Sequence, residues 1–189
     1  MIRRGFLALT VIPPAILVGM GPALAQIEGL TLKPIVKAVR EGDEEKTRQA
    51  LLKGENPNQS DGSGRPLLMI AVMNGYNAVV ETLLKSGAIP DLLDREGYTS
   101  LQRAAERGDV DMVEMLLKRN ANANAQTRQG VTALMIAARL GFSEVVRALL
   151  DKKADPNKPD FTGRTALTYA KQSNRGSIET MLRRAGGRE

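Results

Sequence analysis

Three carboxylates lie close together in the sequence, at Asp109, Asp111 and Glu114. Such a grouping could hold a metal ion or carry out acid–base chemistry. Asp109, however, directly follows Gly108 and precedes an apolar run with helical spacing. An aspartate at that place accepts a hydrogen bond from the free N–H groups of the first helical turn and interacts favourably with the helix dipole. We therefore interpret Asp109 as a helix cap and predict no metal site here.

Two residue types that most catalytic sites require are missing, because the sequence contains no cysteine and no histidine. Zinc sites, haem ligation through histidine, thiol nucleophiles and Ser-His-Asp triads each need one of the two. An enzyme with this composition would depend on a carboxylate pair or a Ser-Lys arrangement. No such constellation lies outside the repeat pattern described below, so we predict a protein that is not an enzyme and binds no cofactor.

The composition describes a helical, moderately basic protein. Of its 189 residues, 42% are hydrophobic but only 3% are aromatic, which suits closely packed helices better than a β-sandwich. The formal net charge is +6. Nucleic acid is not a predicted partner, because the stacking aromatics and the basic runs that bind it are missing.

The first 25 residues have the organisation of a secretory signal peptide. Arg3 and Arg4 form a positive N-terminal region, residues 6–24 are apolar, and Ala23-Leu24-Ala25 has the small-x-small pattern of a cleavage site. The sequence therefore predicts a mature chain that begins at Gln26. Cleavage leaves 25 basic and 21 acidic residues, a net charge of +4.

An uncleaved membrane anchor is the alternative interpretation of the same segment. Pro13 and Pro14 interrupt the apolar run, which is also short for a bilayer. We therefore expect no stable membrane insertion after cleavage. The pair Arg3-Arg4 also resembles a twin-arginine export signal, and the general secretory route stays open. In either case we expect an exported protein, in the periplasm of a bacterium or, alternatively, secreted.

The rest of the chain repeats itself with a period of 33 residues. Five columns share this period, and they consist of Gly64, Gly97, Gly130 and Gly163; Leu68, Leu101, Leu134 and Leu167; Ala71, Ala104, Ala137 and Ala170; Gly75, Gly108 and Gly141; and Leu83, Leu116, Leu149 and Leu182. After a linker at 26–33, we divide the repeat domain 34–187 into the units 34–60, 61–93, 94–126, 127–159 and 160–187.

Each unit predicts two short helices after a tight turn. In the unit 127–159, Gly130 suits a turn with positive φ, and Thr132 is the predicted cap of a first helix over 133–140. Gly141 is expected to end that helix in the left-handed conformation. Helices this short are marginal alone, so stacking of neighbouring units must supply the stability.

The second helix of that unit is predicted to begin at a capping Ser143 and to run to about Lys152. In the first unit the corresponding segment at 44–49 is polar, which suits a terminal unit with one face toward solvent.

These units resemble ankyrin repeats. The resemblance is carried by Gly130-Val131-Thr132-Ala133-Leu134, Ala137-Ala138, Gly141, Val145-Val146, Leu149-Leu150 and the matching residues from Asp94 to Leu117. It implies an all-α solenoid of helix-turn-helix units joined by β-turns or hairpins. It also implies function through protein binding on the hairpin tips and the inner helices.

The sequence departs from the family pattern in three columns. The histidine of the family's Thr-Pro-Leu-His run is replaced throughout, by Met69, Gln102, Met135 and Thr168. We expect the loss of a Thr–His hydrogen bond to lower stability. Asn120 and Lys153 occupy a glycine column, where a left-handed conformation is expected, and Pro66 replaces a capping threonine.

Columns that vary between units are candidates for partner contact, because stacking does not require one residue type there. They lie in the turn around each glycine and at the end of each first helix. The predicted partner-binding residues are Arg65, Arg95, Tyr98, Arg107, Arg128, Arg139, Leu140, Phe161 and Arg164. With Glu96 and Glu106, the six arginines in these columns carry a charge of +4, equal to the net charge of the mature chain.

Arginine mixed with tyrosine and phenylalanine is typical of binding hot spots. We therefore predict a monomeric protein-interaction module with an acidic protein partner, acting as an adaptor, inhibitor or stabiliser of another exported protein. A secreted effector that acts on a partner in another cell remains open. So does a binder of anionic lipid or wall polymer, and exposed arginines with no binding role are an equally open interpretation of the charge.

Overall fold

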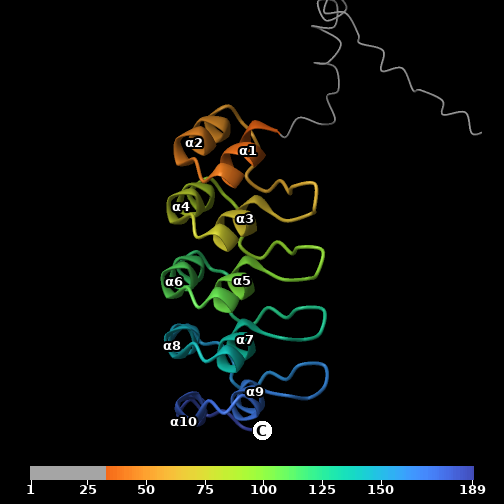
Figure 1. Ribbon diagram of the computed structural model, residues 1–189, viewed down its shortest axis with the longest axis vertical. Helices are drawn as coiled ribbons and strands as arrows, with labels where there is room; N and C mark the ends of the chain where they lie inside the picture. The colour runs from red at the N-terminus through yellow and green to blue at the C-terminus, as the bar shows by residue number, and fades with distance from the viewer. Residues whose placement is uncertain (1–32) are drawn as a thin grey trace, which may run out of the picture. The chain divides into compact units, whose positions relative to one another are not determined.

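The computed structural model describes residues 33–189, which form ten helices in five consecutive pairs (Figure 1). The helices are α1 (Pro34–Glu41), α2 (Glu44–Leu52), α3 (Leu67–Asn74), α4 (Asn77–Lys85), α5 (Ser100–Arg107), α6 (Val110–Lys118), α7 (Ala133–Leu140), α8 (Ser143–Asp151), α9 (Ala166–Gln172) and α10 (Gly176–Arg184). The predicted signal peptide 1–25 and most of the predicted linker 26–33 lie outside the described residues.

The pairs stack in chain order. The first helices pack successively on one another, α1 on α3, α3 on α5, α5 on α7 and α7 on α9, while the second helices form a separate layer. Long hairpin-like turns project from the first helices on the side away from the second helices (Figure 1). Within residues 33–189 the only β pairing outside the helices is a bridge between Ser60 and Pro66. The predicted all-α repeat solenoid is confirmed.

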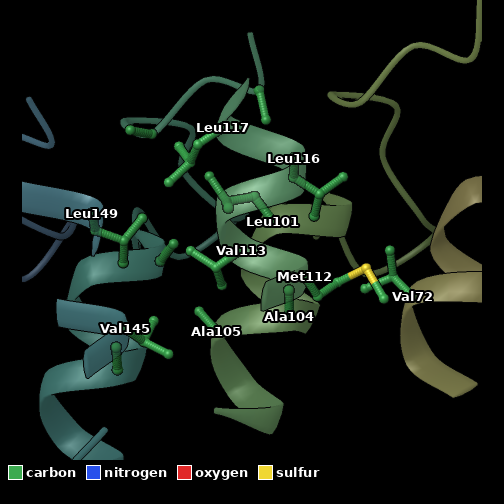
Figure 2. Packing of buried hydrophobic residues seen from close by; sticks show 14 of the residues in the cluster. Val72, Leu101, Ala104, Ala105, Met112, Val113, Leu116, Leu117, Val145 and Leu149 are labelled. Carbon is green, nitrogen blue, oxygen red and sulfur yellow. The ribbon is translucent and has the colours of Figure 1, made fainter. Parts of the chain in front are cut away.

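The apolar columns form one continuous core between the helix layers. Figure 2 shows how the third pair connects its neighbours: the Met112 side chain lies beside Val72 of α3, and Val113 points toward Val145 and Leu149 of α8. All five of these side chains are fully buried. Each unit therefore buries its apolar face only by contact with the units before and after it.

Threonine begins and glycine ends the helix α7 as the sequence predicts. Thr132 accepts a hydrogen bond from the Met135 N–H, and Gly141 adopts the left-handed conformation with φ of 91°. Asn120 and Lys153 also have positive φ, at 61° and 62°, so both residues adopt the left-handed conformation in that glycine column.

The predicted cap at Ser143 is wrong. Helix α8 begins at Ser143 itself, and Phe142 occupies the cap position without a side-chain hydrogen bond. The Phe142 ring instead packs against Gly108 of the preceding unit, where an added Cβ would lie 2.7 Å from the ring. At this cap position, packing of the Phe142 ring on the preceding unit takes the place of a side-chain hydrogen bond to the helix. The helix ends at Asp151, one residue before the predicted end.

The expected loss of the hydrogen bond in the histidine column is also wrong at Gln102. Its Oε1 accepts from the Thr99 N–H at 2.8 Å, which completes a capping box. Its Nε2 then donates to the carbonyl oxygens of Ala125 and Val131 at 3.0 and 2.9 Å. The glutamine amide has both a donor and an acceptor, so one buried side chain caps α5 and also joins the third unit to the fourth.

A ladder of Asn and Asp side chains joins the loops that follow the second helices of neighbouring units. Asn58, Asp91 and Asn124 each accept a hydrogen bond from a backbone N–H of the next unit, at Ile89, Asn122 and Asp155 respectively. Asn157 repeats the pattern with the N–H of Arg188 at 2.7 Å. Residues near 188 therefore take the position of a following unit's loop.

Candidate functional site

In each of the second to fifth units, one buried polar side chain accepts hydrogen bonds from the backbone of the hairpin turn. Asp61, Asp94 and Asp160 occupy the same column of the 33-residue repeat, and each carboxylate accepts hydrogen bonds from two backbone N–H groups of its own turn, those of the residues two and four positions later. In the fourth unit Thr127 fills the same role through its Oγ1. These side chains position every residue on the turns.

Two of the predicted partner-binding arginines are paired with these buried carboxylates. Arg65 Nη2 lies 2.9 Å from Asp61 Oδ2, and Arg164 Nη2 lies 2.9 Å from Asp160 Oδ2. Arg40 of α1 also reaches Asp61, at 2.9 Å. Arg164 is therefore paired with its own carboxylate, while Arg65 shares one with Arg40.

Arg95, Arg128 and Phe161 pack along the row of hairpins. The premise that the stacking of units leaves this column unconstrained is therefore wrong. The first turn residue of one hairpin packs on the glycine of the hairpin before it, which pairs Arg95 with Gly64, Arg128 with Gly97 and Phe161 with Gly130. Each glycine has positive φ, and a Cβ there would come within 2.7 Å of its neighbour. Close approach thus requires glycine in this column, while the outer ends of the arginines and the Phe161 ring remain exposed.

The helix-end residues differ in how they are held. Arg107 donates to the carbonyl oxygen of Met73 in the preceding unit, at 2.7 Å. Arg139 is exposed and has no carboxylate within 4.0 Å among residues 33–189, and Leu140 beside it is half-buried. Tyr98, also half-buried, lies on the same face. All nine predicted residues therefore lie on the hairpins or at the ends of the first helices.

Arg103 is the site residue that the column comparison missed. Its guanidinium lies 3.9 Å from the centre of the Tyr98 ring and forms ion pairs with Asp94, Glu96 and Glu106 at 2.7, 2.7 and 3.1 Å. Only 14% of its side chain is exposed, and its Nε is buried without a partner in the described part of the chain. A signal was present, because this column is otherwise apolar or aromatic, with Ile70, Ile136 and Tyr169.

Two hollows lie between the hairpins and the first helices. The N-terminal hollow, of about 430 Å³, is lined among others by Arg65, Met73, Asp94, Arg95, Glu96 and Arg103. The C-terminal hollow, of about 420 Å³, is lined among others by Tyr98, Glu106, Val131, Arg139, Arg164 and Tyr169. We use the term hairpin face for the surface formed by the hairpin turns and helices α3, α5, α7 and α9. Both hollows open on this face.

The buried aspartates are ionised well below neutral pH. Burial alone would raise the pKa of Asp61, but hydrogen bonds from the Arg65 backbone N–H and from the Arg40 and Arg65 side chains outweigh burial and lower its pKa to about 2. At Asp160, burial also raises the pKa, but hydrogen bonds from Thr162, from the Arg164 backbone and from Tyr169 outweigh burial. The pKa of Asp160 therefore also lies well below its ordinary value.

Acid is therefore expected to destabilise the fold over a defined range of pH. A folded-state pKa below the ordinary value of 3.8 means that unfolding takes up a proton, so the stabilisation from Asp61 is complete above about pH 4 and declines as the pH falls toward 2. Denaturant unfolding measured at intervals from pH 6 to about pH 2 tests this. Asp61→Asn is expected to flatten the curve below pH 4, and an unchanged curve would contradict the prediction.

Neither a metal-binding cluster nor a helix able to span a bilayer occurs in residues 33–189. No three carboxylates there come together in a way that could hold a metal ion. Asp109, one of the three acids considered above, instead accepts from the Met112 N–H at 3.0 Å as a helix cap. None of the ten helices is both long and apolar enough to span a bilayer.

The comparison with known families matches most of the chain. A family model described as ankyrin repeats, in three copies, matches residues 35–127 and 121–186. No curated protein matches the sequence. The match covers all ten helices and both hollows of the hairpin face.

Proposed function

The chain belongs to the ankyrin-repeat family, whose members are generally protein-interaction modules, and we propose that it binds a protein partner on its hairpin face, as a monomer and without catalysing a reaction. The role would be that of an adaptor, inhibitor or stabiliser of another protein. The partner would present acidic side chains, because exposed arginines of successive hairpins lie in line on this face.

One observation carries this proposal. The side chains that vary between units gather on the hairpin face around two hollows of about 430 and 420 Å³, and these contain tyrosine and arginine. Hollows of this size accept individual side chains, and Tyr and Arg are the residues that most often dominate binding energy. The second helices present mainly short-range ion pairs within one turn, such as Arg147 with Glu144.

Comparative capture tests the location of the binding face. Arg128→Glu reverses an exposed charge on a central hairpin, and Arg147→Glu makes the same change on α8 in the other layer. We expect native partners to be captured by the full chain and by Arg147→Glu, and capture to fall at least about tenfold with Arg128→Glu. If only Arg147→Glu reduced the amount of captured partner, the interface would lie on the second helices and the proposal would be refuted.

Residues 1–25 support export as part of this function. We propose cleavage after Ala25 and release of the mature chain into the periplasm, with full secretion as the other destination. The mature protein is expected to begin at Gln26, because signal peptidase accepts the pattern Ala23-Leu24-Ala25. Mass spectrometry of the protein from its native compartment measures this directly. A membrane-bound form with an intact Met1 would contradict it.

A further inference from the structure

We infer that the C-terminal hollow binds a carboxylate side chain of the partner, with Arg139 as its main contact. This inference rests on the proposed function and adds the chemistry of the contact. Its geometry is set by three consecutive units: Tyr98 comes from the third, Val131 and Arg139 from the fourth, and Tyr169 from the fifth. The stacking of rigid units therefore holds these side chains in place before any partner arrives.

One cation in this hollow is available to bind an anionic group. Arg164 is paired with Asp160 at 2.9 Å, and Glu106 shares Arg103, at 3.1 Å, with Asp94 and Glu96. Arg139 is exposed and forms no ion pair within residues 33–189. One cation is thus uncompensated, and a planar guanidinium binds a carboxylate through two parallel hydrogen bonds.

The N-terminal hollow has a similar volume but is lined by more carboxylates. Asp94 and Glu96 line it together with Arg103, with which both form ion pairs, and Arg65 shares Asp61 with Arg40. Arg95 is held to the carbonyl oxygen of Gly62 at 3.1 Å. An acidic side chain would therefore meet two carboxylates and an arginine already held by a carbonyl oxygen in the N-terminal hollow. In the C-terminal hollow it would meet one carboxylate, Glu106, and Arg139, which has no such bond within residues 33–189.

The other lining residues select the occupant further. Val131 and the two tyrosine rings give the hollow apolar walls, so an apolar residue next to the acid would fill the remaining space. A phosphate group, with nearly two charges, needs more than one free cation, and Glu106, which also lines the hollow, would repel it more strongly than it repels a singly charged carboxylate. A protein carboxylate flanked by an apolar residue is the chemistry that fits.

Selection from a display library of random short peptides on the immobilised full chain tests the inference. We expect enriched peptides to carry Asp or Glu beside Leu, Ile or Phe. Changing the acid to its amide, or Arg139 to Gln, is expected to weaken binding about tenfold. Tyr98→Phe leaves the ring in place, so a smaller loss is expected. Arg147→Gln is the matched control and should leave affinity unchanged, with the melting temperature of each variant checked.

Three outcomes would overturn the inference. The first is selection of peptides without acids, or of none. The second is acidic peptides whose affinity does not depend on Arg139. The third is Arg139-dependent binding of inorganic phosphate or of vesicles that contain anionic lipid, which would assign the hollow to another ligand. In the first two cases the proposed function still stands if native partners are captured and Arg128→Glu releases them, so the two proposals fail separately.

Discussion

Replacing Leu134 by alanine is expected to lower the free energy of unfolding by about 2–5 kcal/mol. Leu134 lies in the leucine column of the first helices and is 1% exposed. The neighbouring units are close-packed around it, so the structure can only partly collapse into the cavity that the substitution leaves. Urea unfolding followed by circular dichroism measures the change, with a constant m value showing that only stability has changed.

The same substitution at Leu52 serves as a matched control. Leu52 ends α2 and is 77% exposed, so Leu52→Ala is expected to alter stability by no more than about 0.5 kcal/mol. Equal effects at Leu134 and Leu52 would contradict the stacked arrangement of the first helices, because the leucine column would then not be buried between units.

The ion pair between Asp94 and Arg103, beneath the hairpin of the third unit, is expected to behave as a unit. Asp94→Thr removes the carboxylate from Arg103 but keeps a side-chain oxygen for the turn, as Thr127 does in the fourth unit. We expect a cost of about 2–3 kcal/mol. This is less than the roughly 3–5 kcal/mol for breaking a fully buried pair, because Glu96 and Glu106 still contact Arg103.

The fourth unit supplies the compensating change. It combines Thr127 with Ile136 in the two columns where the third unit has Asp94 and Arg103. The double variant Asp94→Thr with Arg103→Ile should therefore recover stability to within about 1 kcal/mol of the wild type, although each single change is costly. A double-mutant cycle in denaturant measures the coupling. Additive losses would show that the pair contributes no mutual stabilisation and would sink this interpretation.

Periodicity was sufficient to predict the helices and their order. Leucine and alanine recur at 33-residue intervals, and within each unit the apolar residues have helical spacing. The same local sequence pattern therefore predicts the same buried helix face in every unit. The ends of α7 followed from Thr132 and Gly141 for the same reason: capping and left-handed geometry are properties of a residue and its immediate neighbours. The cap at Ser143 was predicted by that rule and was wrong, because the Phe142 ring packs on Gly108 from another unit.

The positions of the candidate binding residues were also predictable, but their interactions were not. The column comparison placed Arg65, Arg139 and Arg164 on the hairpin face without distinguishing them. Only the structure shows Arg65 and Arg164 paired with buried aspartates while Arg139 has no such pairing in the described region. The charge available to a partner is therefore less evenly spread than the count of arginines suggested.

The sequence by itself determined the repeat, the helix pairs and the exclusion of histidine and cysteine chemistry, because each depends on residue type and on spacing along the chain. The tertiary structure decided which charges are free, where Arg103 lies, and that Gln102 joins two units. These features depend on distances between side chains from different turns and units. A shift of a few ångströms decides whether an ion pair forms, and a spacing of 33 residues along the chain does not specify such distances.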